Sequence, residues 1–424
     1  MVNNNIKIIN NFEGAMIGNY SIENNNLFIQ LKKEKPTLGY KKKEFDYNLH
    51  FNFGIKNNSQ DDKEFNVFID CTKEDELQHS IPWLWISNDS NNEYELVKNI
   101  SGKTNFHGKY YFKFNIKGNQ STFIANFPPK NYNELKKEFE KLSSKTNALK
   151  FIIGKTVEDR EIIAYEYGDI VNKPTLLFVS GFHPPERDTI SIEAIMEKFL
   201  DKKWRKKVLN DFSISLIPIL NPDGFANSMQ GSNINGINFH WKFFGNTKNE
   251  CPEAYNIWQY CKKIRPIVFF DFHAFTFQNN NARPYWIPEG FYISKKARLI
   301  QKYYNIKLSN LCGIKNNKTS RNETILAPTL LATRLRNIIG TITVPKFHLH
   351  MKDGIEKSKQ MTVNCLEIIL KGLYKYKLFS SKEILKFPYG NGKPYLSDIF
   401  RIKVLNIWFF YLIPILKKIM KIKN

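Results

Sequence analysis

A histidine and a glutamate three residues apart stand in a segment whose residue types suit metal binding. His183 and Glu186 follow Gly181, and the Pro184-Pro185 pair between them fixes φ at two positions. Glycine allows the chain to turn sharply at this point because it has no Cβ atom. Zinc binds imidazole nitrogen and carboxylate oxygen, and a catalytic zinc usually has three protein ligands and one open position. The segment therefore predicts two zinc ligands, and the third must come from elsewhere.

The elements around this segment indicate a sheet with helices packed on it. Residues 176–179 are Leu-Leu-Phe-Val, which has the length and composition of a buried strand. Apolar side chains recur at helical spacing from Thr189 to Leu200, and residues 213–220 read as another buried strand. This alternation predicts an α/β domain with a mostly parallel or mixed sheet, in which sites form at the carboxyl ends of strands.

His273 stands at the end of a further apolar run and is the predicted third ligand. Residues 266–272, Pro-Ile-Val-Phe-Phe-Asp-Phe, form a near-continuous apolar strand that ends directly before it. Taken alone, His273 would equally suit a buried histidine with satisfied hydrogen bonds. Its position at a strand end matches that of His183 and Glu186, so we predict that these three residues bind Zn²⁺.

The first part of the chain, residues 1–130, is predicted to be an N-terminal β-sandwich domain. Its strand-like segments alternate with a period of two, and turn-forming runs such as residues 56–62 separate them. The segments are residues 26–31, 47–53, 65–70, 110–116 and 122–127. The three histidines of this region, His50, His79 and His107, are scattered and are expected to have surface or packing roles.

Pro128-Pro129 marks the boundary to a second domain, predicted to cover residues 131–375 and to begin with a helix from Tyr132 to Leu142. The remaining residues, 376–424, form a basic and apolar C-terminal tail. Its apolar run 404–416 is shorter than the roughly 20 residues that span a bilayer. It suits either a membrane interface, with Trp, Tyr and Lys as anchors, or docking on the protein or a second copy.

The overall charge and the cysteines set further expectations. The formal net charge is +23, which would attract an anionic partner, but a bias toward Lys, Asn and Ile accounts for it equally well. We therefore expect no nucleic-acid partner. The five cysteines are odd in number, widely spaced and without a CxxC pair, so they do not predict a disulfide framework. The first ten residues lack the apolar segment of a signal peptide, and a cytoplasmic location is expected.

Four ordered segments resemble the zinc carboxypeptidase family of the carboxypeptidase A type, and the cytosolic carboxypeptidase branch most closely. His183-Pro-Pro-Glu186 is similar to the His-Pro-Gly-Glu of that branch, and Asn221-Pro-Asp-Gly224 to its Asn-Pro-Asp-Gly turn. Asp271-Phe-His273 resembles its third-ligand strand, and residues 123–132 the junction between its domains. The resemblance implies a carboxypeptidase-like mixed sheet flanked by helices after a β-sandwich. It also implies a zinc metallopeptidase that hydrolyses amide bonds.

This chain departs from the family where the substrate and the proton are handled. His240-Trp241 replaces the Asn-Arg pair that binds a terminal carboxylate, and Met229 or Gln230 stands where an earlier arginine would fall. Val344 takes the place of the general-base glutamate, and valine cannot accept a proton. The altered pocket suits a substrate without a free α-carboxylate, as for an amidase, a deacylase or a peptidase of modified ends.

Other residues near Val344 offer alternatives for the lost groups. His348, His350, Asp353 and Glu356 are candidate proton carriers, although a solvated or structural role is the better expectation for each. Lys346 is a candidate anion anchor, but one lysine lacks the forked geometry of arginine. Two functions therefore stay open. The first is a zinc hydrolase that acts on a peptide or acyl-amide substrate. The second is a catalytically degenerate carboxypeptidase-like binding protein.

Overall fold

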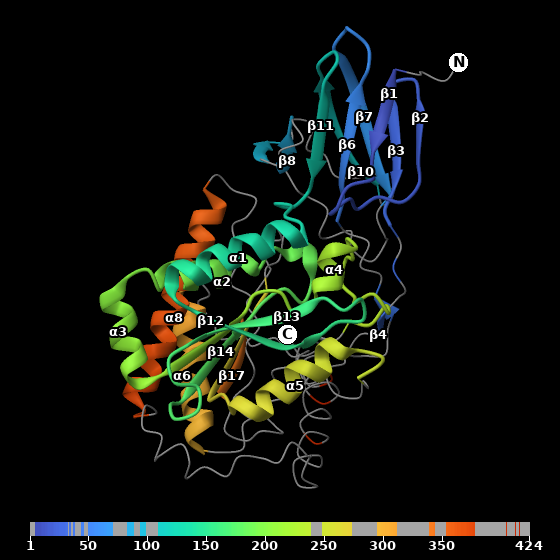
Figure 1. The fold of residues 1–424 in the computed structure, drawn as a ribbon. Helices are drawn as coiled ribbons and strands as arrows, with labels where there is room; N and C mark the ends of the chain where they lie inside the picture. Colours follow the sequence, from blue (N-terminus) through green and yellow to red (C-terminus); the bar gives the residue numbers. More distant parts are fainter. Residues whose placement is uncertain are drawn as a thin grey trace.

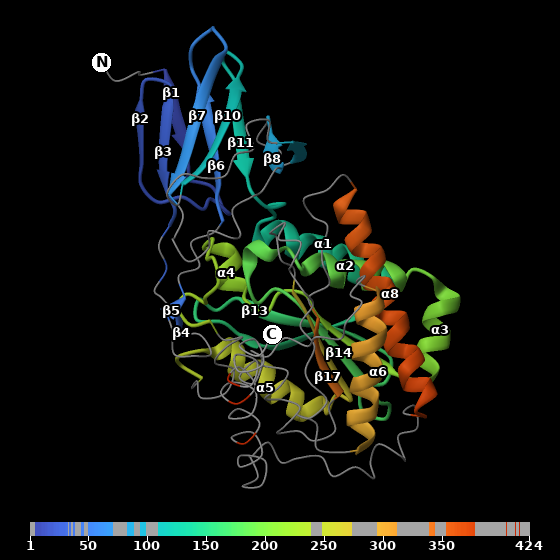
Figure 2. The same ribbon diagram turned by 180° about the vertical axis from the view of Figure 1, so that it is seen from behind.

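A β-sandwich projects from one end of a larger α/β body, as Figures 1 and 2 show. The structure is a computed structural model. It describes residues 5–32, 34, 37–38, 44–45, 50–70, 83–88, 94–98, 109–238, 248–273, 295–311, 339–343 and 353–377, with the isolated residues 404, 412 and 415. This architecture confirms the predicted fold class, a mixed α/β fold preceded by a β-sandwich.

The sandwich consists of two packed sheets. The five-stranded sheet has the order β1 (Ile6–Ile9), β6 (Asn52–Asn57), β11 (Ser121–Ala125), β8 (Trp83–Ser87), β9 (Glu95–Lys98). The four-stranded sheet has the order β10 (Lys109–Ile116), β7 (Lys63–Asp70), β3 (Asn26–Gln30), β2 (Tyr20–Glu23). Phe65, Val67 and Ile69 alternate along β7 and meet Phe53 and Ile55 of β6 in one core, as the period of two predicts. A separate short pair is β4 (Thr37–Leu38) with β5 (Glu44–Phe45).

The first helix of the α/β body, α1 (Tyr132–Thr146), begins at a capping box. The Asn131 side chain accepts a hydrogen bond from the Glu134 N–H (2.8 Å), and the Glu134 carboxylate accepts one from the Asn131 N–H (2.9 Å). The helix continues one turn past its predicted end at Leu142. Hydroxyl groups in this last turn bond to carbonyls of the preceding turn, and Asn147 then ends the helix with a φ of 55°.

Six strands form the central sheet of the α/β body, and the last four in spatial order run parallel. The order is β12 (Leu149–Lys155), β13 (Glu161–Tyr167), β15 (Ser213–Ile217), β14 (Thr175–Val179), β16 (Val268–Phe272), β17 (Ile339–Thr343). The pairing of β12 with β13 contains one irregularity. Gly154 lies within β12 at a register shift, where a Cβ would come 2.1 Å from the Asn256 side chain. The turn itself is residues 156–160.

Helices cover both faces of this sheet. One face carries α1, α2 (Thr189–Lys198), α3 (Lys202–Asp211), α6 (Lys295–Leu311) and α8 (Gly354–Lys375), and the other carries α5 (Pro252–Ile264). Along β14, Leu176 and Phe178 pack under the first group, whereas Leu177 and Val179 pack against α5. Because both faces are buried, the strand reads as a continuous apolar run rather than an alternating one.

The parallel pairing of β14 with its two neighbours places three chain segments at one edge of the sheet. Val179, the last residue of β14, lies opposite Ile217 of β15 and Asp271 of β16. The residues that follow these strands therefore emerge side by side. After β15 comes the short helix α4 (Pro222–Ala226), and after β14 comes the 3-10 turn η2 (Pro184–Glu186).

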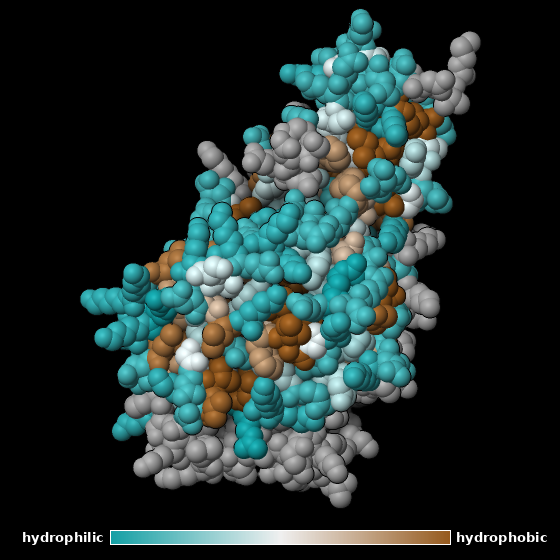
Figure 3. Space-filling view, in the orientation of Figure 1, coloured by the Kyte–Doolittle hydropathy of each residue, from teal (hydrophilic) through white to brown (hydrophobic). Residues whose placement is uncertain are grey.

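The surface over α1 is largely hydrophilic (Figure 3), because Lys137, Lys141 and Lys145 on its outer side are exposed. Among the helices that the structure describes, none has both the length and the apolar character that crossing a bilayer requires.

Gly181 is the position where a side chain would disturb the edge of the sheet most directly. Its φ is +73°, and a Cβ would come 2.7 Å from the Pro218 carbonyl oxygen and 3.0 Å from the Ile219 Cα. We expect Gly181→Ala to lower the free energy of unfolding by about 1–3 kcal/mol in a denaturant titration, because both strain and a backbone contact arise.

Ser180→Ala is the matched control for this prediction. It removes only the hydrogen bond from the Ser180 hydroxyl to the same Pro218 carbonyl (2.8 Å) and should cost about 1 kcal/mol. A Gly181→Ala variant as stable as the wild-type protein would show that the edge relaxes around a side chain.

Candidate metal site

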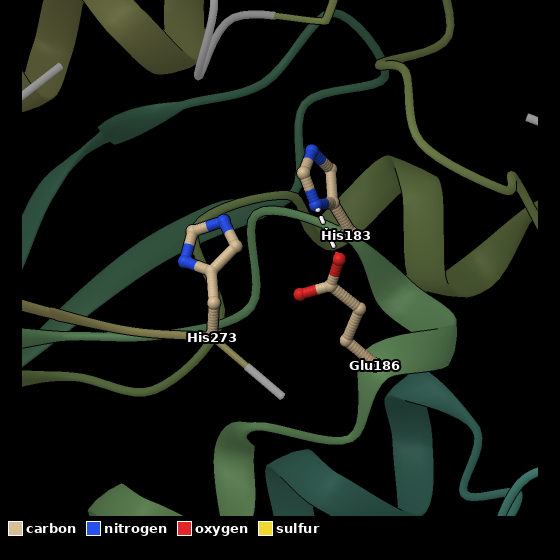
Figure 4. Close-up of side chains that lie close together, drawn as sticks. All are labelled: His183, Glu186 and His273. Atoms are coloured by element: carbon tan, nitrogen blue, oxygen red, sulfur yellow. Dashed lines mark hydrogen bonds and ion pairs between the residues drawn. The ribbon is translucent and has the colours of Figure 1, made fainter. Parts of the chain in front are cut away.

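Two imidazoles and one carboxylate meet at the carboxyl ends of β14 and β16. His183, Glu186 and His273 each offer a ligand atom, and these three atoms lie within 4.8 Å of one another. Figure 4 shows the three side chains pointing toward one common space, two from the turn after β14 and one from the end of β16. Both histidines are buried, at 4% and 6% exposure. The structure thus brings the three predicted zinc ligands together.

The turn that carries His183 and Glu186 is braced by its own sequence. Pro184 and Pro185 form the first positions of η2, where proline fits because no N–H is needed there. Arg187 ends the turn with a φ of 54°. The buried Asp188 carboxylate accepts a hydrogen bond from the Gly181 N–H (2.9 Å) and so closes the segment into a loop. The two ligands are therefore held before any ion arrives.

The two nitrogens of His183 face different partners. Nε2 lies 3.3 Å from the amide oxygen of Asn238, and Nδ1 lies 2.8 Å from Oε1 of Glu186. Because an amide oxygen only accepts hydrogen bonds, the tautomer that pairs with Asn238 carries its proton on Nε2 and presents the Nδ1 lone pair to Glu186. A lone pair and a carboxylate oxygen at this distance repel unless a proton or a cation lies between them. A metal ion held by both atoms satisfies this requirement.

His273 is oriented by a carboxylate from its own strand. Side chains two residues apart in a strand lie on the same side, so Asp271 and His273 are neighbours, with Oδ1 3.0 Å from Nδ1. The other edge of the ring packs near His183, with ring centroids 5.1 Å apart, and its face lies against Phe182. A carboxylate behind a metal-binding histidine fixes its orientation and raises its basicity.

The charges around the two imidazoles favour a cation. Burial lowers the pKa of His273, but the negative charges of Asp271, Glu186 and Asp188 outweigh burial and raise that pKa to about 10. Burial, in turn, raises the pKa of Asp188 well above its ordinary value. Three carboxylates thus surround two imidazoles in a place with little water, and positive charge is stabilised there.

The donor set fits zinc. Two histidine nitrogens and one glutamate oxygen are a ligand combination of catalytic zinc sites, in which the fourth position stays open. Both rings also have an oxygen partner behind them, Asn238 for His183 and Asp271 for His273, as metal-binding histidines usually do.

Several supporting residues were not predicted from the sequence. Asn238 belongs to no motif in the sequence, since the comparison with the family concerns the neighbouring His240 and Trp241. The feature of the sequence that could have indicated Asn238 is Gly236, two residues earlier. Glycine favours a tight turn there, and its φ is +76°. Asp188 belongs to no motif either. A single aspartate after a Pro-Pro turn and before a helix would suit the role of a helix cap equally well.

The remaining predicted residues fall into three groups. Asp353 and Glu356 lie at the start of α8, are exposed, and do not belong to the three-residue ligand group. The second group lies outside the described residues, namely His79, His107, His240, Trp241, Val344, Lys346, His348, His350 and the apolar tail run apart from residues 404, 412 and 415. Of the pocket positions, Met229 and Gln230 are buried, and His50 is a buried histidine that packs against Phe127.

Comparisons with known proteins agree with this geometry. Residues 135–273 match the family model of zinc carboxypeptidases. A metallo-carboxypeptidase from Burkholderia cenocepacia is similar in fold, with a TM-score of 0.70, 14% identity, and coverage of 88% of this chain and 100% of that one.

A second similar fold is the metallo-carboxypeptidase from Pseudomonas aeruginosa in complex with (2-guanidinoethylmercapto)succinic acid. It has a TM-score of 0.69 and 14% identity, with coverage of 87% of this chain and 99% of that one. A search of curated proteins gave no match. The resemblance to zinc carboxypeptidases inferred from the sequence is confirmed over residues 135–273 by the family model, and the similar structures share the fold of the chain.

The contact between Asn238 and His183 predicts a definite tautomer. Asn238→Ala removes the acceptor for Nε2–H, so the ¹⁵N signals of His183 in the metal-free protein should change from the Nε2–H form toward a mixture of tautomers. Zinc should then bind about tenfold more weakly.

Asn238→Asp keeps an oxygen acceptor at the same place and serves as the control. It should retain the ¹⁵N pattern of the wild-type protein. An Asn238→Ala variant whose His183 signals and zinc affinity both match the wild type would exclude a role for this amide.

Proposed function

We propose that this chain, whose residues 135–273 match the zinc carboxypeptidase family, is a zinc-dependent hydrolase of amide bonds. The observation that carries the proposal is the convergence of three ligand atoms, from His183, Glu186 and His273, within 4.8 Å at the ends of adjacent parallel strands. The metallo-carboxypeptidase fold of the similar structures supports the same function, although fold alone does not assign it.

Each residue has a distinct part in this mechanism. His183, Glu186 and His273 would hold the metal, while Asn238 and Asp271 keep the two rings in their orientation. Zinc in such a site polarises a carbonyl group and lowers the pKa of water toward about 7. Burial of both histidines limits water to the open position and strengthens every charge interaction within the site.

The proposed substrate is a peptide or an acyl amide without a free α-carboxylate. The sequence replaces the family's Asn-Arg pair by His240-Trp241, and a guanidinium that would bind a carboxylate in a forked geometry is missing there. At the earlier arginine position, the Gln230 side chain bonds to the backbone of His50 and is thereby occupied. A neutral chain end would therefore suit this pocket better than a charged one.

The cytosolic carboxypeptidase branch and a cytoplasmic location complete the proposal, and both rest on the sequence alone. The apolar run in the tail would add contact with a membrane surface. Cell fractionation would decide between these sites. Recovery of the whole chain in the washed membrane pellet would exclude a freely diffusing cytoplasmic protein.

The metal content tests the proposal directly. Purified protein should carry about one zinc per chain in an elemental analysis, and the double variant His183→Ala with His273→Ala should carry none, because one carboxylate remains. His50→Ala is the matched control. It removes another buried imidazole, which packs against Phe127 away from the three ligands, and should keep its zinc.

A chain that purifies without zinc and does not take it up would refute the hydrolase, and so would a double variant that retains the full metal content.

The alternative is a catalytically degenerate binding protein on the same fold. The observation that favours it is Val344, which replaces the general-base glutamate of the family by our alignment. Zinc-loaded protein would then be inert toward a panel of peptides and acylated amines. Val344→Glu should create measurable hydrolysis, whereas Val344→Gln, which has the same shape but accepts no proton, should not. Turnover by the wild-type protein would instead support the hydrolase.

A further inference from the structure

The loop that leads from α4 to Asn238 is held by side chains and backbone of the other domain. We propose that the β-sandwich is a working part of the metal site, and that Glu34 is a positioning residue for His183. The proposal rests on the metal site assigned above and adds how that site is kept in shape. It follows from four sets of contacts.

The Glu34 carboxylate accepts hydrogen bonds from three donors in the loop between α4 and Asn238. It accepts hydrogen bonds from the backbone N–H groups of Gln230 and Gly231, the latter at 3.2 Å, and from the Ser232 hydroxyl at 2.7 Å. Successive backbone N–H groups that point at one anion form a concave binding site for it, and the anion in turn holds their conformation. Bonds to an ionised acceptor are about twice as strong as neutral ones. Glu34 therefore holds three successive residues, two through their backbone N–H groups and the third through its hydroxyl.

Gln230 provides a second attachment to the sandwich. Its side-chain oxygen accepts a hydrogen bond from the His50 N–H (2.8 Å), and its side-chain N–H donates to the His50 carbonyl (2.7 Å). Both residues are buried, at 1% and 3% exposure. The side chain thus pairs with the His50 backbone as a neighbouring strand would, and satisfies two polar groups that would otherwise be buried unpaired.

From this anchored backbone a first path runs to the metal site. The Asn221 side chain donates hydrogen bonds to the Ser232 carbonyl (2.9 Å) and to the Phe182 carbonyl (3.2 Å). Phe182 directly precedes His183 and stacks on His273. One asparagine therefore ties the loop that Glu34 holds to the backbone of the zinc-ligand turn.

A second path continues along the loop itself. Residues 233–237 are clipped into a small closed turn, because the Asn233 N–H bonds to the Ile237 carbonyl and the Asn233 side chain accepts from the Ile237 N–H, both at 2.9 Å. The Asn233 amide is tied in turn to the buried Glu253 (3.0 Å). The next residue, Asn238, contacts His183 Nε2. A displacement at Ser232 is therefore transmitted to the ring of His183.

These contacts explain why the sandwich has to be present. From Asn227 to Asn238 the loop has no helix or strand, so its buried polar groups depend on partners elsewhere in the molecule. At its start these partners are Glu34 and His50, which belong to the other domain. Without these partners, the start of the loop would no longer be held in place, and the Asn238 amide would not be kept against His183.

The test compares Glu34→Ala with Asn133→Ala, which breaks a contact between the same domains without touching the loop from Asn227 to Asn238. Asn133→Ala removes a 2.8 Å hydrogen bond to Glu13. The full chain is titrated with Co²⁺ alone, its absorption spectrum is recorded, and the ¹⁵N signals of His183 are measured without metal.

We expect Glu34→Ala to weaken Co²⁺ binding about tenfold, to change the Co²⁺ spectrum, and to mix the tautomers of His183. Asn133→Ala should match the wild type in all three. Ser232→Ala removes one of the same bonds from the loop side, so it should shift the measurements in the same direction if Glu34→Ala folds poorly.

The outcomes separate the two proposals. If the wild-type protein binds no Co²⁺, the proposed metal site is wrong. The ¹⁵N signals of His183 in metal-free Glu34→Ala would then still show whether the loop determines the orientation of the His183 ring. Wild-type protein that binds Co²⁺, together with a Glu34→Ala variant of equal affinity, spectrum and ¹⁵N pattern, overturns the positioning role alone. Equal losses in all the interdomain variants would also overturn it, since they would show general destabilisation.

Discussion

The parallel pairing of β14 with β16 is the constraint from which the site follows. Hydrogen bonds from Leu176–Val268 to Val179–Asp271 set the two strand ends level, so the turn after β14 and the residue after β16 emerge together. A slip of β16 by one residue would reverse its sides relative to β14 and would turn His273 away from His183. The buried apolar side chains on both faces of β14 hold that register.

The sequence predicted the parts of this arrangement that local chemistry determines. An apolar run followed by Gly181 and a Pro-Pro pair gives a strand and a stiff turn, and the strand-end rule connects it with His273. Two other features depend on contacts that no local pattern contains. Gly154 lies within a strand at a place where the Asn256 side chain leaves no space for a Cβ. Glu34 has no motif around it, and its partners are some 196 residues away.

The two domains contribute different residues to the candidate metal site. The α/β body supplies all three candidate ligands, and the sandwich supplies anchors for the loop that orients one of them. By the resemblance to the family, a substrate-binding arginine would fall in the same loop, near Gln230. In this chain, the Gln230 side chain attaches one domain to the other, which supports the proposed substrate without a free α-carboxylate.

The brace between Asp188 and Gly181 has a consequence for the protein without its ion. Because the turn is closed by a hydrogen bond of the protein itself, its shape does not depend on coordination. Chelation would then leave the backbone at this edge nearly unchanged, and an ion could leave and return without refolding of the chain. The ion would thus behave as an exchangeable part of a finished scaffold, unlike the zinc of small domains that collapse when it is withdrawn.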